Sequence, residues 1–214
     1  MGDIAGGVAQ MAPGAAGDVA GAMVEANPDG AADMAATVAE NVPGAAGAVA
    51  GAIAEADPAL AAEAAGAMME ANPAAASAAA AGMANAAPEV AGDVAGAMMD
   101  VAMAPDFAAD FAENAATANP EIAGEIAGAM MDAAPELAAE AATAMMEAVP
   151  DAAGAIAGGV ARGDADIAAQ VATDMVSANP ELMGDIAGGV AQMAPGAAGD
   201  VAGALVEALS LIHI

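Results

Sequence analysis

The stretch Pro120-Glu-Ile-Ala-Gly-Glu-Ile-Ala-Gly-Ala-Met-Met-Asp-Ala-Ala134 is followed at once by Pro135-Glu-Leu-Ala-Ala-Glu-Ala-Ala-Thr-Ala-Met-Met-Glu-Ala-Val149, a second version of the same fifteen-residue unit. The proline that opens the unit recurs along almost the whole chain of 214 residues. A fixed period of this kind is the signature of a repeat architecture. The prolines in this series are Pro13, Pro28, Pro43, Pro58, Pro73, Pro88, Pro105, Pro120, Pro135, Pro150, Pro180 and Pro195.

The period is interrupted twice. Two extra residues lie between Pro88 and Pro105, and Ala165 stands where the period predicts a proline. At the second interruption Asp164 and Asp166 keep the polar residues that flank the proline elsewhere. Both interruptions therefore preserve the unit around them.

Each unit predicts one short helix of about twelve residues that begins at its proline. Proline is favoured at the first helical position, since its missing N–H would have no partner there, and the residue before it is kept out of the helical conformation, as an N-cap requires. Acids that follow the proline interact favourably with the positive end of the helix dipole. The predicted cap residues are Asn27, Asp57, Asn72, Asn119 and Asn179, and the acids after proline are Asp29, Glu89, Asp106, Glu121, Glu136, Asp151 and Glu181.

Helical periodicity places the larger apolar residues on one side of each unit. Counting the proline as position 1, these residues occupy positions 3, 7, 11 and 14, which share one sector of a helix at about 100° per residue. Acids at positions 2, 6 and 13 form a narrow stripe beside them. In the quoted unit the apolar residues include Ile122, Ile126 and Met130, and the acids are Glu121, Glu125 and Asp132.

Glycine or alanine recurs at positions 5 and 9, inside the predicted helices. A glycine in a helix interior costs about 0.5–1 kcal/mol relative to alanine. Its recurrence therefore indicates that helix backbones approach each other closely. Examples are Gly17 and Gly21, Gly92 and Gly96, and Gly124 and Gly128.

These features predict an all-α fold, an α-solenoid of single-helix repeats. A helix of about twelve residues is marginal alone in water, so neighbouring helices must stabilise it. Short connections make consecutive helices antiparallel. We expect about fourteen such helices in one continuous array over residues 1–208.

The sequence also repeats over a longer distance. Residues 1–26 recur as residues 183–208, and the one difference is that Met23 becomes Leu205. This indicates recent duplication and predicts that the chain is a fragment of a longer repeat protein.

The tail, residues 209–214, departs from the pattern, which predicts Asn-Pro at positions 209 and 210. The sequence there is Leu-Ser-Leu-Ile-His-Ile. It resembles translated read-through of a sequencing adapter at the end of an assembled environmental reading frame, which would make His213 non-native. The alternative is a genuine hydrophobic extension.

Charge restricts the partners. Thirty acids and one basic residue, Arg162, give a net charge of −29. Such a surface repels nucleic acid phosphates and anionic membranes, so we expect no nucleic acid partner. Salt would relieve repulsion between the acidic stripes, which fits a marine or halophilic source, although GC-rich coding also favours this composition.

No cysteine is present, which excludes disulfides and thiolate metal sites. We expect no transmembrane segment, because no apolar stretch is long enough and free enough of polar residues. No secretory signal is visible. We predict no cofactor and no metal site.

Two motifs invite a functional interpretation. Methionine pairs could bind Cu(I) through their thioethers, but they recur at core positions and favour packing. Arg162-Gly163-Asp164 matches a cell-adhesion tripeptide, yet Arg in a last helical turn, Gly just past it and Asp as the next cap explain it structurally. The pairs are Met68-Met69, Met98-Met99, Met130-Met131 and Met145-Met146.

The sequence predicts no enzyme. Tyrosine, tryptophan and cysteine are absent, and Ser77, Ser177 and Ser210 have no evident base. We expect a non-enzymatic acidic scaffold, spacer or protein-interaction segment, with self-association through repeats as one possibility. One alternative is a surface or coat protein that binds a hydrophobic polymer or lipid interface. Another is an acidic repeat that binds divalent cations or a mineral, since carboxylates align across successive helices.

Overall fold

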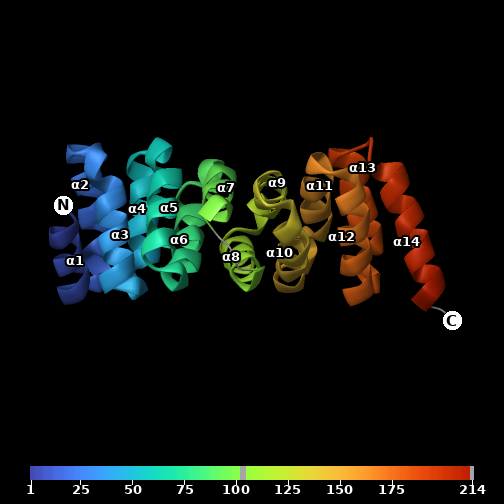
Figure 1. The fold of residues 1–214 in the computed structure, drawn as a ribbon, viewed down its shortest axis with the longest axis horizontal. Helices are drawn as coiled ribbons and strands as arrows, with labels where there is room; N and C mark the ends of the chain where they lie inside the picture. The colour runs from blue at the N-terminus through green and yellow to red at the C-terminus, as the bar shows by residue number, and fades with distance from the viewer. Residues whose placement is uncertain (102–104, 213–214) are drawn as a thin grey trace. The chain divides into compact units, whose positions relative to one another are not determined.

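In the computed structural model of the chain, nearly every unit forms a helix that begins at or just after its proline (Figure 1). The structure describes the backbone of residues 1–101 and 105–212, and the side chains of residues 1–99 and 108–208. The two-residue insertion, His213 and the side chains of Asp106 and Ser210 therefore lie outside the described residues. All regular elements in the described part are helical, which confirms the all-α repeat fold.

Contacts divide the residues into two compact units, Met1–Phe107 and Ala108–Ile214. Helix α8 (Pro105–Ala118) begins just before the boundary. The continuity of residues 1–208 as one array stays a prediction. The first unit contains α1 (Gly2–Met11), α2 (Ala16–Ala26), α3 (Ala31–Asn41), α4 (Ala46–Ala56), α5 (Ala61–Ala71), α6 (Pro73–Ala86) and α7 (Ala91–Val101).

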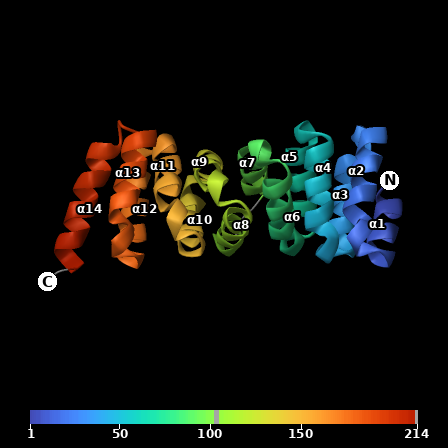
Figure 2. The same cartoon turned by 180° about the vertical axis from the view of Figure 1, so that it is seen from behind.

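The second unit holds most of α8 and the helices after it. Helix α14 runs into the tail, where no proline interrupts it. In both views the helices of each unit follow one another in chain order (Figures 1 and 2). These helices are α9 (Ala123–Ala133), α10 (Pro135–Ala148), α11 (Ala153–Gly163), α12 (Ala165–Ala178), α13 (Met183–Met193) and α14 (Ala198–Ile212).

The helix starts are more elaborate than the sequence predicts. In several units the proline opens a three-residue 3-10 turn, and an α-helix of eleven residues follows directly, as in Pro120–Ile122 and α9. Elsewhere one helix of fourteen residues begins at the proline, as in α6 and α10. Tight first turns of this kind are common at helix N-termini.

Most predicted caps are confirmed. The side chains of Asp57, Asn72, Asn119 and Asn179 each accept a hydrogen bond from the backbone N–H two residues later. The exception is Asn27, whose side chain makes no cap hydrogen bond. Its amide instead donates to the sulfur of Met1 at 3.4 Å.

Helices two repeats apart in sequence lie side by side, and they form two layers within each of the two compact units. A β-carbon built on Gly17, at position 5 of α2, would lie 3.0 Å from the carbonyl oxygen of Ala48, at position 6 of α4. One built on Gly51, at position 9 of α4, would lie 2.9 Å from that of Gly82, at position 10 of α6. Matching positions therefore lie together, so these helices run parallel. The helix between them must run back, which confirms the antiparallel prediction.

We call the line of contact between two such parallel helices a seam. In three seams a glycine at position 5 of one helix lies against a glycine at position 10 of the next. These three seams are also the most extensive helix–helix contacts in the described residues. The pairs are Gly47 with Gly82 (α4 and α6), Gly124 with Gly159 (α9 and α11) and Gly154 with Gly189 (α11 and α13).

The core is wider than one apolar stripe. Positions 7 and 11 are buried as predicted, for example Ile126 and Met130. Positions 8 and 12 are also buried, for example Ala127 and Met131, whereas position 14 is only half-buried, as at Ala133. The reason is that each inner helix is covered by both seam neighbours and by the opposite layer. Only the edge with the acids faces water.

Candidate functional site

Carboxylates line the solvent edge of the helices. No charged or polar side chain in the described part of the chain is buried. At positions 6 and 13, acids such as Asp18, Glu25 and Glu55 are exposed. An ionised carboxylate only accepts hydrogen bonds, so this edge offers acceptors and no side-chain donors from its acids. This edge therefore presents a repeated negative surface.

Shallow grooves follow the seams between these acids. One groove of about 410 Å³ runs over α2, α4 and α6, where glycines leave space between the helices. Its base is mostly glycine and alanine, and Asp18 and Glu55 stand among its lining residues. A groove of about 330 Å³ over α12 and α14 is similar, with Asp166 and Glu207 among small residues. The second groove also contains the hydroxyl of Thr173, which donates a hydrogen bond to the carbonyl oxygen of Ala169, and neither groove is lined by a histidine or a lysine.

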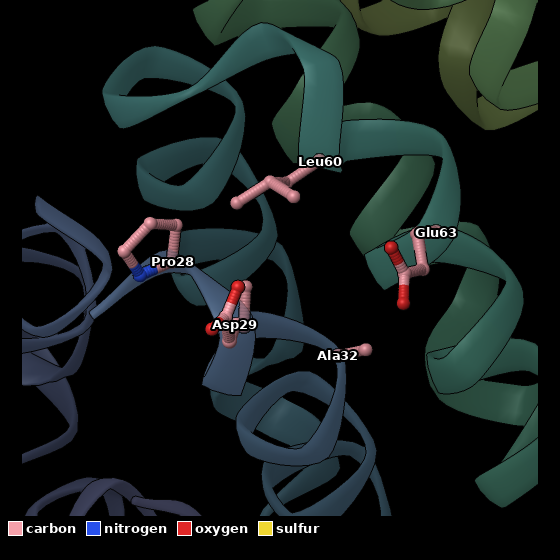
Figure 3. A pocket seen from close by; sticks show the side chains of 6 residues that line it. Pro28, Asp29, Ala32, Leu60 and Glu63 are labelled. Carbon is pink, nitrogen blue, oxygen red and sulfur yellow. The ribbon is translucent and has the colours of Figure 1, made fainter.

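A smaller hollow lies where α3 and α5 begin. Its volume is about 170 Å³, whereas ligand pockets usually measure about 300–1,000 Å³ and surround most of the ligand. Figure 3 shows Pro28 and Leu60 beside the hollow, together with the carboxylates of Asp29 and Glu63. Both carboxylates are exposed. The hollow is therefore a gap between repeats rather than a shaped pocket.

Carboxylates do not converge in the described part of the chain. No three Asp, Glu or His side chains there come together as a metal ion would need. A calcium cage needs about six to eight oxygen ligands. The acids of successive helices instead lie apart from one another along the solvent-exposed edge.

The methionine pairs lie in the core. Met68, Met98 and Met145 are 0% exposed, and Met69 and Met131 are nearly so. Their flexible side chains fill the space between layers in which alanine predominates. This burial agrees with the packing interpretation of the pairs.

The Arg162-Gly163-Asp164 sequence lies where α11 ends and α12 begins. The Asp164 side chain accepts hydrogen bonds from the N–H groups of Asp166 and Ile167, at 2.9 and 3.0 Å, so its predicted role as a cap is confirmed. The predicted position of Gly163 is wrong. It is the last residue of α11 and has no positive φ.

The reason for a glycine at position 163 is packing. A β-carbon there would lie 2.5 Å from Cγ of Met131 on α9. Arg162 also reaches α9, because its guanidinium lies 3.5 Å from the carbonyl oxygen of Gly124. Arg162 and Gly163 are therefore part of the seam between α9 and α11, whereas Asp164 caps α12.

The serines lie on separate helices. Ser77 on α6 is half-buried, and Ser177 near the end of α12 is exposed. Ser210 and His213 lie outside the described side chains. The described residues therefore place no base beside a serine, and the prediction that the chain is not an enzyme stays a prediction.

Two structural features were missed by the sequence analysis. One is glycine at position 10, as at Gly82, which completes the closest seams. The other is the exposure of large apolar side chains on the first and last helices, Ile4, Met11 and Val206. The near-exact recurrence of residues 1–26 as residues 183–208 was the available signal for the second feature, since two segments of nearly the same sequence have different neighbours in the chain.

Among the described residues, no helix combines the length and the hydropathy needed to cross a membrane. Comparisons with protein-family models, with curated proteins and with solved structures found no match.

Proposed function

We propose that this chain is a non-enzymatic, acidic helical-repeat scaffold, a spacer or protein-interaction segment of a larger repetitive protein. The observation that carries the proposal is the distribution of apolar and acidic residues over the surface of the helices. The apolar positions pack against neighbouring helices, and the acids face water in the described repeats that carry them, which are all except the repeat that forms α6. Such a structure extends by adding units and presents the same surface each time.

The exposure of the acidic side chains favours an interaction role over a catalytic one. Catalytic groups usually depend on burial or on a close charged partner to adjust their pKa. The described acids are exposed, apart from the half-buried cap Asp57, and the grooves beside them are shallow and lined mostly by small residues. A partner that binds this edge would be cationic or would approach through bound cations.

Circular dichroism and amide hydrogen exchange in dilute buffer test the proposal. A scaffold of packed repeats should be helical without any ligand, with slow exchange in the inner helices α4 and α11 and a cooperative loss of helix on heating. Helix that forms only after addition of neutral phospholipid vesicles would overturn the proposal and favour the coat protein.

A matched pair of variants sharpens this test. Ile53→Ala removes a side chain that is 0% exposed in α4, and Ala48→Ser changes an exposed residue of the same helix. In a packed array Ile53→Ala should lower the free energy of unfolding by about 2–5 kcal/mol, and Ala48→Ser should change it by about 0.5 kcal/mol. Equal effects would contradict a packed core.

A further inference from the structure

Met193 is the last residue of α13 and lies in the seam between α11 and α13. It occupies position 14 of its repeat, where most other repeats have alanine. The sulfur of Met193 lies 2.6 Å from the place that a β-carbon on Gly158 would occupy, and the β-carbon of Met193 lies 3.0 Å from that place. Gly158 therefore leaves a space on α11 that the methionine side chain fills.

The same contact recurs in another close seam with a smaller residue. A β-carbon built on Gly51, at position 9 of α4, would lie 3.3 Å from the β-carbon of Ala86, at position 14 of α6. Gly158 is likewise at position 9 of its repeat. Positions 9 and 14 thus meet in both seams, and the seam between α11 and α13 holds a thioether where the other holds a methyl group.

Met193 is half-buried, whereas most methionines in the described part of the chain lie in the core. Its contact with water follows from its position in the repeat. Position 14 is also half-buried at Ala56 on α4 and exposed at Gly163 on α11, and both of these helices have a neighbour on each side in their layer. The exposure of Met193 therefore does not require an uncovered helix face.

A thioether that reaches water can be oxidised. A peroxide removes two electrons from the sulfur: one peroxide oxygen bonds to sulfur, the O–O bond breaks, and the other oxygen leaves as water. The product is methionine sulfoxide, which replaces a flexible apolar side chain with a polar one. Buried methionines are protected, because susceptibility to oxidation follows exposure. Met145 and Met175 are examples, since both are 0% exposed.

The surroundings of the Met193 sulfur do not suit a sulfoxide. Its oxygen accepts hydrogen bonds, and the N–H groups in the interior of α11 already donate within the helix. The carbonyl oxygen of Gly189, which is another acceptor, lies 2.8 Å from the same β-carbon position on Gly158. A polar group without a hydrogen-bond partner is costly in such a contact. The oxidised side chain must therefore leave the space beside Gly158 and turn toward water.

We propose that Met193 is a site of reversible oxidation, at which a peroxide converts the thioether to the sulfoxide and loosens the close contact between α11 and α13. This contact is one of the three seams with a glycine pair, so the change acts where two helices pack most closely. Methionine sulfoxide reductases reverse the step, since a dithiol is oxidised to a disulfide while the sulfoxide oxygen leaves as water. The site goes beyond the proposed scaffold function and does not depend on it.

Treatment of the full chain with dilute hydrogen peroxide, followed by peptide mass spectrometry, tests the selectivity of the site. Met193 should be oxidised at least about tenfold faster than Met175, because oxidation follows exposure. Other methionines that contact solvent should react as well, and Met193→Leu and its control below separate their effects. These methionines are Met1, Met11, Met23 and Met183.

Amide hydrogen exchange of the oxidised chain tests the effect on packing. Exchange in α13 and in the facing part of α11 should become about tenfold faster, which corresponds to about 1.4 kcal/mol. Exchange in α4, which belongs to the first compact unit, should not change. Incubation with methionine sulfoxide reductases and a dithiol should restore slow exchange.

Two leucine substitutions on α13 identify the responsible sulfur. Met193→Leu keeps an apolar side chain of similar volume beside Gly158 but carries no sulfur. Peroxide should then no longer accelerate exchange in α13. Met183→Leu is the matched control, because it removes another half-buried thioether of the same helix. This control should respond to peroxide like the unmodified chain.

Three results would overturn the proposal. The first is complete oxidation of Met193 with no faster exchange in α13. The second is acceleration by peroxide that persists in Met193→Leu, and the third is oxidation of Met193 no faster than that of Met175. The first and third are measured on the unmodified chain, so they decide the question even if Met193→Leu folds poorly.

Discussion

Two seams of the second unit pack differently. Helix α13 lies closely on α11, where Gly154 meets Gly189, whereas α12 makes a much smaller contact with α10. The residues at the same positions in the looser seam are Ala139 and Asp174, and Asp174 is exposed. The comparison indicates that the pair at positions 5 and 10 sets how closely two repeats approach, although the rest of the unit is similar.

The largest effect on stability is expected from a bulky residue in the close seam between α11 and α13. Gly189→Leu should lower the free energy of unfolding by about 3 kcal/mol or more, because a β-carbon there already overlaps the backbone of Gly154. Asp174→Leu changes the same position of the looser seam and should alter stability by no more than about 1 kcal/mol. Urea unfolding followed by circular dichroism measures both. Similar losses would break the comparison.

In the first compact unit, two glycine-to-alanine substitutions test the role of position 10, because they should change stability in opposite directions. Gly82→Ala should destabilise the protein by about 1–3 kcal/mol, since its β-carbon would overlap the backbone of Gly47. Gly66→Ala, on α5, meets nothing within 4 Å and should stabilise by about 0.5–1 kcal/mol through helix propensity. Thermal unfolding of both variants in one buffer separates the two signs. Stabilisation by Gly82→Ala would refute the role of position 10.

The rule also explains what the sequence could predict. Glycine at positions 5 and 9 recurs often enough to indicate close packing, and Gly17 and Gly124 do lie against the next helix of their layer. At Gly66, position 9 of α5, a β-carbon would meet nothing within 4 Å, although α7 packs beside α5 in the same layer, so this glycine does not mark a close approach. A glycine needs a suitable partner two units away, and the period of a single unit carries no information about that partner.

Other differences have the same physical origin. The helix length and the proline positions follow from local backbone geometry, so they were predictable. The burial of Met131 at position 12 depends on coverage from three sides, which a one-sided helix pattern does not show. The different exposure of Ile4 on α1 and Ile186 on α13 depends on which helices lie beside them, since residues 2–11 and 184–193 have the same sequence.

The connection between α11 and α12 gives a third test, in which a smaller loss of stability is expected. Asp164 joins α11 to α12 and accepts two backbone hydrogen bonds, so Asp164→Ala should cost about 1 kcal/mol. Asn27 occupies the equivalent position before Pro28 without a cap hydrogen bond. Asn27→Ala should therefore change stability by less than about 0.5 kcal/mol. Equal losses in urea unfolding would show that position, and not the hydrogen bond, determines the effect.

The smallest expected effect comes from salt and acts on both seams. Raising NaCl from about 0.02 M to about 0.5 M should screen repulsion between the acidic edges and raise the midpoint of thermal unfolding by about 2–4 °C, which corresponds to about 1 kcal/mol. Sucrose serves as the control, because it favours compact states without screening charge. Asp174→Asn removes one carboxylate from the looser seam and should reduce the response to NaCl slightly. A response to NaCl no greater than that to sucrose would mean that hydration already separates the carboxylates, and seam packing alone would then account for the difference between α12 and α13.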